Sequence, residues 1–175
     1  MRRAVLVVLF AAMPLLLLWA ADEGGKFDPT GYAPAQPIAY SHKTHLALGL
    51  KCNGCHAMKD TDAGEGFVMG FPKEAFCMGC HSSIKKDSPE IAKLAKAAAE
   101  KKPVEWARVY RLLPIVWFSH AAHVTDGKIA CGTCHGDMAS MPLTTKARVL
   151  NMKDCMDCHA EHGAPNGCDS CHASQ

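Results

Sequence analysis

Ten cysteines in this 175-residue chain fall into five copies of one pattern, Cys-x-x-Cys-His, and no cysteine is left over. Two thiols three positions apart lie along one edge of a helical turn, where they can add to the two vinyl groups of a porphyrin as thioethers. The histidine that follows can then reach the iron from one face. The pattern therefore predicts five covalently bound haem c groups.

The residues that this chemistry requires can be read directly from the five copies. The candidates for thioether formation are Cys52, Cys55, Cys77, Cys80, Cys131, Cys134, Cys155, Cys158, Cys168 and Cys171. The candidates for the proximal iron ligand are His56, His81, His135, His159 and His172. A structural zinc site would need two cysteine pairs for each metal and no trailing histidine. Disulfides or a redox dithiol leave that histidine unexplained too, so haem attachment is the favoured interpretation.

Five histidines remain after this assignment, which equals the number of expected haems. These candidate distal ligands are His42, His45, His120, His123 and His162. On a helix, His42 and His45 would lie about 5–6 Å apart on one side, so they cannot bind one iron from opposite faces. Each His-x-x-His pair must therefore serve two haems and hold them close together.

The expected pairing follows the order of the motifs along the chain. It joins His42 to His56, His45 to His81, His120 to His135, His123 to His159 and His162 to His172. Exchange of ligands between the two halves of the chain is the alternative pairing. One iron with a methionine ligand and a higher potential is a further alternative.

An internal repeat organises these ligands, because residues 40–45 and 118–123 both read aromatic, Ser, His-x-x-His ahead of two haem motifs. We therefore expect a mainly α and irregular fold with few short β strands, built from a duplicated dihaem module plus a fifth haem. The expected parts are 1–21 (signal peptide or membrane anchor), 22–36 (linker), 37–102 (first dihaem module with a connecting helix), 103–160 (second dihaem module) and 161–175 (fifth haem segment). Only twelve aromatic residues are present, so porphyrins are expected to fill much of the interior.

Local signals place a few regular elements around the motifs. Ser88, Pro89 and Glu90 predict the start of a helix that ends before Pro103. Its expected apolar face contains Ile91, Leu94, Ala95 and Ala98. Residues 38–40 and 115–118 are expected to form short strands, and residues 62–72 a glycine-rich loop.

The first residues indicate export. Arg2 and Arg3 precede an uncharged run over residues 4–21, which fits either a cleaved signal peptide or an uncleaved membrane anchor. Eighteen residues make about 27 Å of helix, close to the thickness of a bilayer core. In both cases the remainder of the chain is expected on the periplasmic side of the cytoplasmic membrane.

Charge and the count of histidines narrow the functions that remain. The 19 basic and 17 acidic residues give a formal net charge of +2, so nucleic acid is not an expected partner. With a distal histidine available for every iron, we expect an electron-transfer protein, not an enzyme, without a small-molecule substrate at iron. A multihaem reductase with one open haem is the alternative, as is a stand-alone periplasmic carrier to metals or other acceptors.

Over residues 37–172 the chain resembles the class III multihaem cytochromes of the c3 and c7 group, on the His-x-x-His and Cys-x-x-Cys-His patterns described above. Residues 106–114, 118–120 and 134–138 are similar to the pentahaem subunit of alternative complex III and related quinone-reductase complexes. That resemblance implies electron transfer within a menaquinol-oxidising membrane assembly and a tether formed by the N-terminal helix. One departure is Tyr110, where the family often has histidine.

Overall fold

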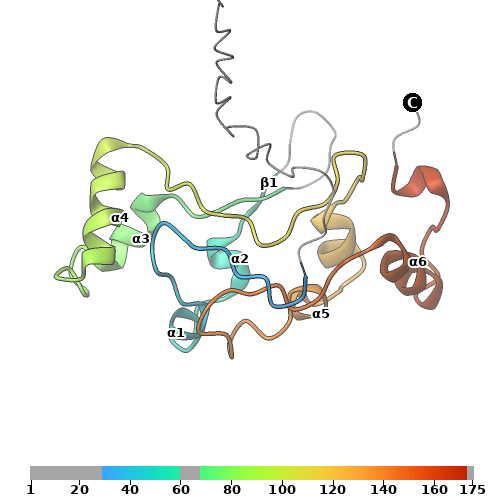
Figure 1. Cartoon of the computed structure of the whole chain (residues 1–175), viewed down its shortest axis with the longest axis horizontal. Helices are drawn as coiled ribbons and strands as arrows, with labels where there is room; N and C mark the ends of the chain where they lie inside the picture. Colours follow the sequence, from blue (N-terminus) through green and yellow to red (C-terminus); the bar gives the residue numbers. More distant parts are fainter. Residues whose placement is uncertain (1–28, 60–67, 173–175) are drawn as a thin grey trace, which may run out of the picture.

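The computed structural model describes residues 29–59 and 68–172, and Figure 1 shows their course. Short helices are joined by long irregular segments, as the sequence predicts. The elements are α1 (His42–Leu46), α2 (Cys52–Cys55), β1 (Met58–Lys59), β2 (Val68–Met69), α3 (Glu74–His81), α4 (Pro89–Glu100), η1 (Ala121–Asp126), α5 (Cys131–His135), α6 (Met152–Glu161) and η2 (Cys168–Ser170). The mainly helical and irregular fold is confirmed.

Every Cys-x-x-Cys-His motif coincides with a helical turn. The first motif forms α2 and the third forms α5, while the second and fourth end α3 and α6. The fifth lies on η2. Since positions three apart share one side of a helical turn, both cysteines of each motif face the same way. Figure 1 places α3 at one end of the molecule, α2 and α5 near the middle and α6 at the other end.

Helix α4 begins and ends where the sequence predicts. Pro89 occupies the first turn after Ser88, although the Ser88 side chain makes no capping hydrogen bond. Lys101 adopts a left-handed conformation with φ 53°, which turns the chain out of the helix. Leu94 on the predicted apolar face is buried, and α4 packs beside α3. The prediction of a connecting helix is confirmed.

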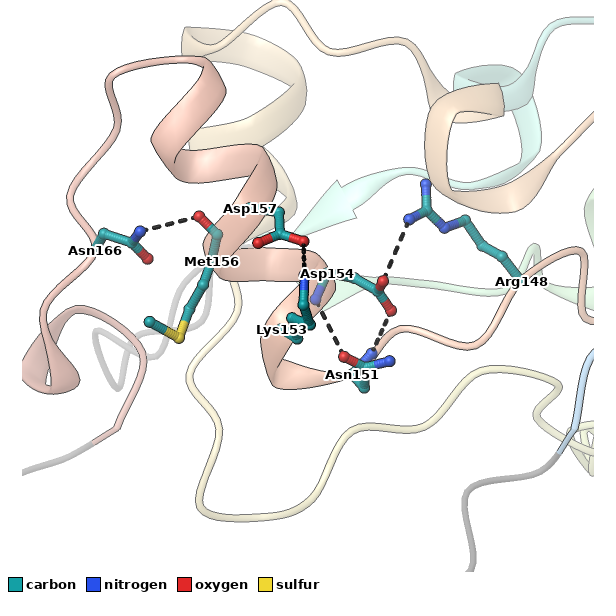
Figure 2. A network of polar contacts seen from close by, with 7 residues as sticks. All are labelled: Arg148, Asn151, Lys153, Asp154, Met156, Asp157 and Asn166. Carbon is teal, nitrogen blue, oxygen red and sulfur yellow. Dashed lines mark hydrogen bonds and ion pairs between the residues drawn. The ribbon is translucent and has the colours of Figure 1, made fainter.

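Helix α6 begins with a reciprocal cap that Figure 2 shows. The Asn151 side chain accepts a hydrogen bond from the Asp154 backbone N–H at 3.1 Å, and the Asp154 carboxylate accepts one from the Asn151 N–H at 3.1 Å. Together these bonds satisfy two backbone donors that a helix start leaves unpaired. The cap fixes the start of the helix that carries the fourth haem motif.

The strands lie elsewhere than predicted. The β-structure within the described ranges is the antiparallel pair β1 and β2 and an isolated bridge between Val116 and His172. Residues 38–40 and 115–118 do not form the expected strands. An extended segment becomes a strand only when a second segment pairs with it along its length, and the single bridge at Val116 does not provide this. Gln36, just before residues 38–40, bonds the N–H and the C=O of Ala107 with its side chain at 3.0 and 2.9 Å.

The described part of the expected linker is attached to the second half of the chain. The Gly31 N–H donates to the Lys146 carbonyl at 2.7 Å, and the Lys146 N–H donates to the Tyr32 carbonyl at 2.9 Å. The expected signal peptide or anchor at 1–21 lies outside the described residues, as does most of the expected loop at 62–72. None of the helices in the described ranges combines the length and apolar character needed to cross a bilayer.

Apolar side chains build only a small core. Four of them are buried among the described residues, namely Ile38, Leu94, Val109 and Ala121. Several large ones are exposed, including Leu48, Phe76, Ile115, Trp117 and Leu143. Burial of apolar surface is the main driving force of folding, so a chain of this length with so little of it requires another source of cohesion.

Glu90 connects α4 to the segment that leads into α1. Its carboxylate accepts hydrogen bonds from the Ala39 N–H at 2.6 Å and from the Lys93 ammonium at 2.6 Å. The bond from Lys93, followed by that from Ala39, lowers the pKa of Glu90. A lowered folded-state pKa means that the stabilisation is present above the pKa of an unfolded glutamate, about 4.3, and is lost as pH falls through the folded-state value.

We therefore expect Glu90→Ala to lower the melting temperature near neutral pH and to change it much less at about pH 3. Thermal unfolding followed by circular dichroism at both pH values measures this. Glu100→Ala removes an exposed partner of Lys96 on the same helix and is the matched control, with little expected effect. An equal loss at both pH values would show that the carboxylate is not the stabilising group.

Candidate functional site

Four pairs of histidine rings face one another across the interior. Each pair joins a histidine of a His-x-x-His segment to the histidine of a Cys-x-x-Cys-His motif. The distances between ring centres are 6.1 Å for His42–His56, 6.1 Å for His45–His81, 6.4 Å for His120–His135 and 5.8 Å for His123–His159. These are four of the pairs that the order of motifs predicts.

The spacing of the rings fits one metal ion between each pair. A bond from a metal to an imidazole nitrogen is about 2 Å long, and that nitrogen lies about 1.1 Å from the ring centre, so two rings on opposite sides of one iron have centres about 6.2 Å apart. The four observed distances, 5.8–6.4 Å, lie around this value. The side chains are therefore placed as bis-histidine ligation of a haem iron requires.

Hydrogen bonds to the backbone orient most of these rings. A carbonyl oxygen only accepts, so each Nδ1 bonded to one carries the hydrogen and leaves Nε2 free to bind a metal. Six histidines have such a bond. The pairs are His45 with Ser41 (2.9 Å), His56 with Gly70 (3.0 Å), His81 with Ile84 (3.0 Å), His123 with Ser119 (2.7 Å), His159 with Pro165 (2.6 Å) and His172 with Ile115 (3.0 Å).

The partner of His42 could not be predicted from the sequence. Its Nδ1 lies 2.8 Å from the Thr144 hydroxyl oxygen, a contact between residues 102 positions apart. When Nε2 binds a metal, Nδ1 is the donor and the threonine oxygen the acceptor. Thr144 has no neighbouring motif, so only packing of the second module against the first reveals it.

An aromatic side chain separates the two histidines of each His-x-x-His segment. Tyr40 stacks on His45 at 4.4 Å and meets His42 edge-on at 4.9 Å. Phe118 does the same in the second module, stacking on His123 at 4.5 Å and meeting His120 edge-on at 4.8 Å. The aromatic residue of the repeat thus holds the two imidazoles at different angles, so that they point to different partners.

Burial keeps several candidate ligands in the form that binds metal. It is the largest cause of the lowered pKa of His42, His120 and His135, and a neighbouring imidazole lowers each further. A lowered pKa leaves the ring neutral at physiological pH. Because only the unprotonated nitrogen can donate electrons to iron, these rings need not lose a proton on binding it.

Tyr110 supports the third motif. Its hydroxyl donates to the Cys134 carbonyl at 3.3 Å and accepts from the Ala147 N–H at 2.8 Å, while its ring meets His135 edge-on at 4.6 Å. Lys146, only 5% exposed, places its ammonium 5.7 Å from the ring centres of Tyr110 and Tyr32. Tyr110 therefore packs against a candidate ligand.

The effect of a cysteine in one motif on the pKa of a cysteine in another shows which motifs lie side by side. After burial, the thiolate of Cys55 raises the pKa of the Cys77 thiol, so the first and second motifs lie side by side. Burial, and then the charge of Cys52 and a hydrogen bond to it, raise the pKa of Cys131. The first motif therefore lies beside the third as well. Thioether formation would remove these titrations but not the proximity.

The third motif lies beside the fourth, and the fourth beside the fifth, on the same kind of evidence. Burial is the largest cause of the raised pKa of the Cys134 thiol, and Cys158 adds to it against the opposing charge of Arg148. Burial and then Cys171 raise the pKa of Cys155. The spatial order of the motifs is thus second, first, third, fourth and fifth, which agrees with the course from α3 to α6 in Figure 1.

All ten cysteines are free thiols in the structure, but one predicted histidine pair is not formed. His162 makes no ring contact with His172, nor with any other described histidine. Its side chain is exposed, whereas the other nine histidines are half-buried. The structure therefore brings eight of the ten candidate ligands into facing pairs, orients His172 without a facing imidazole and leaves His162 at the surface.

Comparison with known proteins agrees with this site. Residues 116–173 match the family described as cytochrome c7 and related cytochrome c. The chain is 33% identical over 165 aligned positions to the menaquinone reductase multihaem cytochrome c subunit of Nitratidesulfovibrio vulgaris, covering 78% of this chain and 76% of that protein. It is 33% identical to cytochrome c3 of Desulfovibrio desulfuricans over 70 positions, covering 29% of this chain and 69% of that one.

The chain therefore belongs to the class III multihaem cytochromes c. Proteins of this class carry covalently bound haem c and transfer electrons. The resemblance read from the sequence is confirmed. The facing imidazoles supply the ligands that such a cofactor needs.

Replacing Thr144 by valine tests the contact to His42. The loss of an acceptor at Nδ1 makes the imidazole a weaker electron donor, so we expect the midpoint potential of one haem to rise by up to about 59 mV, a tenfold change in its reduction equilibrium. Spectroelectrochemical titration measures the change. Thr145→Val is the matched control, because within the described residues that hydroxyl donates its hydrogen bond to the Met141 sulfur, at 3.7 Å, and not to a histidine. A shift of equal size in both variants would contradict the assignment.

Proposed function

We propose that this chain is a pentahaem c-type cytochrome that transfers electrons on the periplasmic side of the cytoplasmic membrane, as a subunit of a quinol-oxidising respiratory complex. The facing of four histidine pairs at 5.8–6.4 Å is the observation that carries the proposal. A haem iron between two imidazoles supplies reversible one-electron chemistry when bound. The chain provides the ligands and the environment for that chemistry.

Each residue type in the site has its own role. The ten cysteines attach the porphyrins, and the histidines that end the motifs bind the irons from one face. His42, His45, His120 and His123 bind four of the irons from the opposite face. The backbone carbonyls at Nδ1 fix the tautomers of these ligands, and Tyr40 and Phe118 fix their directions.

The spatial order of the motifs supports a role in conduction. The second motif, on α3, and the fifth, on η2, lie at the two ends of the series, and each intervening motif has a neighbour on both sides. No motif is isolated from the others. A protein arranged in this way can accept an electron at one end and release it at the other.

The partner is inferred from the relative and from the N-terminus. The relative that this chain matches over 76% of its length is named as a subunit of a menaquinone reductase. The uncharged run at 4–21 would direct this chain across the membrane or attach it there. Together these observations favour a membrane-bound, quinone-linked complex over a free carrier. The quinol-oxidising direction rests on the sequence resemblance to the pentahaem subunit of alternative complex III.

The cofactors are tested by counting haems and irons in the purified protein. We expect five haems per chain by intact mass spectrometry and pyridine haemochrome assay, and at least four low-spin irons by low-temperature electron paramagnetic resonance. Two axial imidazoles give low-spin iron, which is the physical reason for the second number. Fewer than four low-spin irons would contradict bis-histidine ligation by the four pairs.

The partner is tested in membranes. A tagged full-length chain is expected to co-purify with integral membrane proteins in mild detergent, and the complex is expected to reduce its haems when menaquinol is added. A His45→Ala variant that retains its haems removes the proposed distal ligand of the second motif, at one end of the series, and is expected to change the rate of this reduction. A haem-loaded chain found only in the soluble periplasmic fraction, with no response to menaquinol, would contradict the proposal.

A further inference from the structure

The fifth motif differs from the others in what faces its histidine. In each of the first four motifs, the histidine meets a second imidazole at 5.8–6.4 Å. Across the described ranges, His172 makes no such ring contact. The remaining candidate, His162, is exposed, unlike the other four distal candidates. At each of the first four motifs, two imidazoles are placed to bind an iron from opposite faces. At the fifth motif, a histidine is placed to bind it from one face.

The backbone around His162 makes hydrogen bonds that end helix α6 and orient the histidine of the fourth motif. His162 caps the C-terminus of α6, where its N–H donates to the Cys158 carbonyl at 3.0 Å. The turn that follows bends back over α6, so that the Pro165 carbonyl accepts from His159 Nδ1 at 2.6 Å. The turn thus orients the ligand of the fourth motif. The backbone on both sides of His162 is therefore held by hydrogen bonds to helix α6.

A second bond holds the same turn. The Asn166 side-chain amide donates to the Met156 carbonyl at 2.9 Å, a bond that Figure 2 shows. Asn166 stands between the turn and the fifth motif, so both ends of the segment from His162 are attached to α6. The loop that carries the exposed His162 side chain is therefore held against α6.

His172 is organised like the other proximal ligands. Its Nδ1 lies 3.0 Å from the Ile115 carbonyl, which leaves Nε2 as the metal-binding nitrogen. The Trp117 N–H donates to the Cys171 carbonyl at 2.7 Å, and Val116 forms a β-bridge with His172. The motif is thus fixed along residues 115–117. One axial ligand of the fifth iron is thus oriented by a hydrogen bond to a backbone carbonyl, as in most of the other motifs.

We propose that the fifth haem takes a single axial ligand from this chain, His172, and that its sixth position binds a small exogenous ligand. The ligand class is that of five-coordinate haems: a neutral diatomic molecule such as carbon monoxide on ferrous iron, or a small anion such as cyanide on ferric iron. The step is formation of one dative bond, without transfer of electrons. The inference rests on the proposed haem attachment at Cys168 and Cys171, and it departs from the expectation that His162 is a ligand.

The position of this site gives it a distinct role. The fifth motif is the last in the series and lies beside the fourth through Cys155 and Cys171. A ligand bound there would raise or lower the potential of the terminal haem and so change how readily electrons reach that end. The other four haems, with both axial positions occupied by imidazoles, would not respond.

The test uses the haem-loaded full-length chain and carbon monoxide as the probe. We expect a high-spin ferric signal equal to about one haem per chain, and uptake of about one carbon monoxide per chain after reduction. His162→Ala is expected to leave both values unchanged. His123→Ala is the matched variant and is expected to add one high-spin haem and one carbon monoxide. If His162→Ala loses haem, His162→Gln gives the same comparison.

Two results would overturn the inference. Five low-spin haems without carbon monoxide uptake would mean that the chain closes the sixth position itself, by His162 or by a methionine such as Met156, which follows Cys155. A rise in carbon monoxide uptake in the His162→Ala protein would identify His162 as a ligand. Failure of the proposed function appears separately, as the loss of low-spin signal from the other four haems.

Discussion

Two imidazoles that bind one iron from opposite faces must come from two different segments, because a single helical turn presents its histidines on one side. This constraint shapes the described chain. Each His-x-x-His segment is brought opposite two haem motifs, so that one short segment connects two cofactor sites. The apolar core around these sites is small, with Ile38, Leu94, Val109 and Ala121 as its buried members in the described ranges. We therefore expect covalent attachment and axial ligation of haem to supply cohesion that side-chain packing does not.

The surroundings of the ligands follow from the same constraint. A histidine that must point at a metal has to be held at its other nitrogen, and backbone carbonyls serve this purpose at six positions. Carbonyls are available wherever the chain is irregular, which explains why long stretches lack regular structure. Tyr40 and Phe118 complete the arrangement by keeping neighbouring imidazoles at different angles. The irregular backbone is thus part of the ligand framework.

Local elements were predictable where their cause is local. Helix α4 could be placed because Pro89 fixes its start and Pro103 prevents its continuation, and the structure ends it at Glu100. The expected strands at 38–40 and 115–118 were wrong, because β-structure depends on a partner that the segment itself does not specify. Within 115–118 the pairing is a single bridge from Val116 to His172. Attachment of Gly31 to Lys146 was equally invisible, since it joins positions far apart in the chain.

The sequence by itself was enough to predict the attachment chemistry, since two thiols and a histidine within five residues are the signature of one haem c. It also predicted that the histidines of each His-x-x-His segment have different partners, because helical spacing places them on one side of a turn. Only the tertiary structure decided that Thr144 supports His42, that the motifs run in the order second, first, third, fourth and fifth, and that His162 stays at the surface. These three features depend on how segments tens of residues apart pack together. The spacing of residues along the chain does not predict that packing.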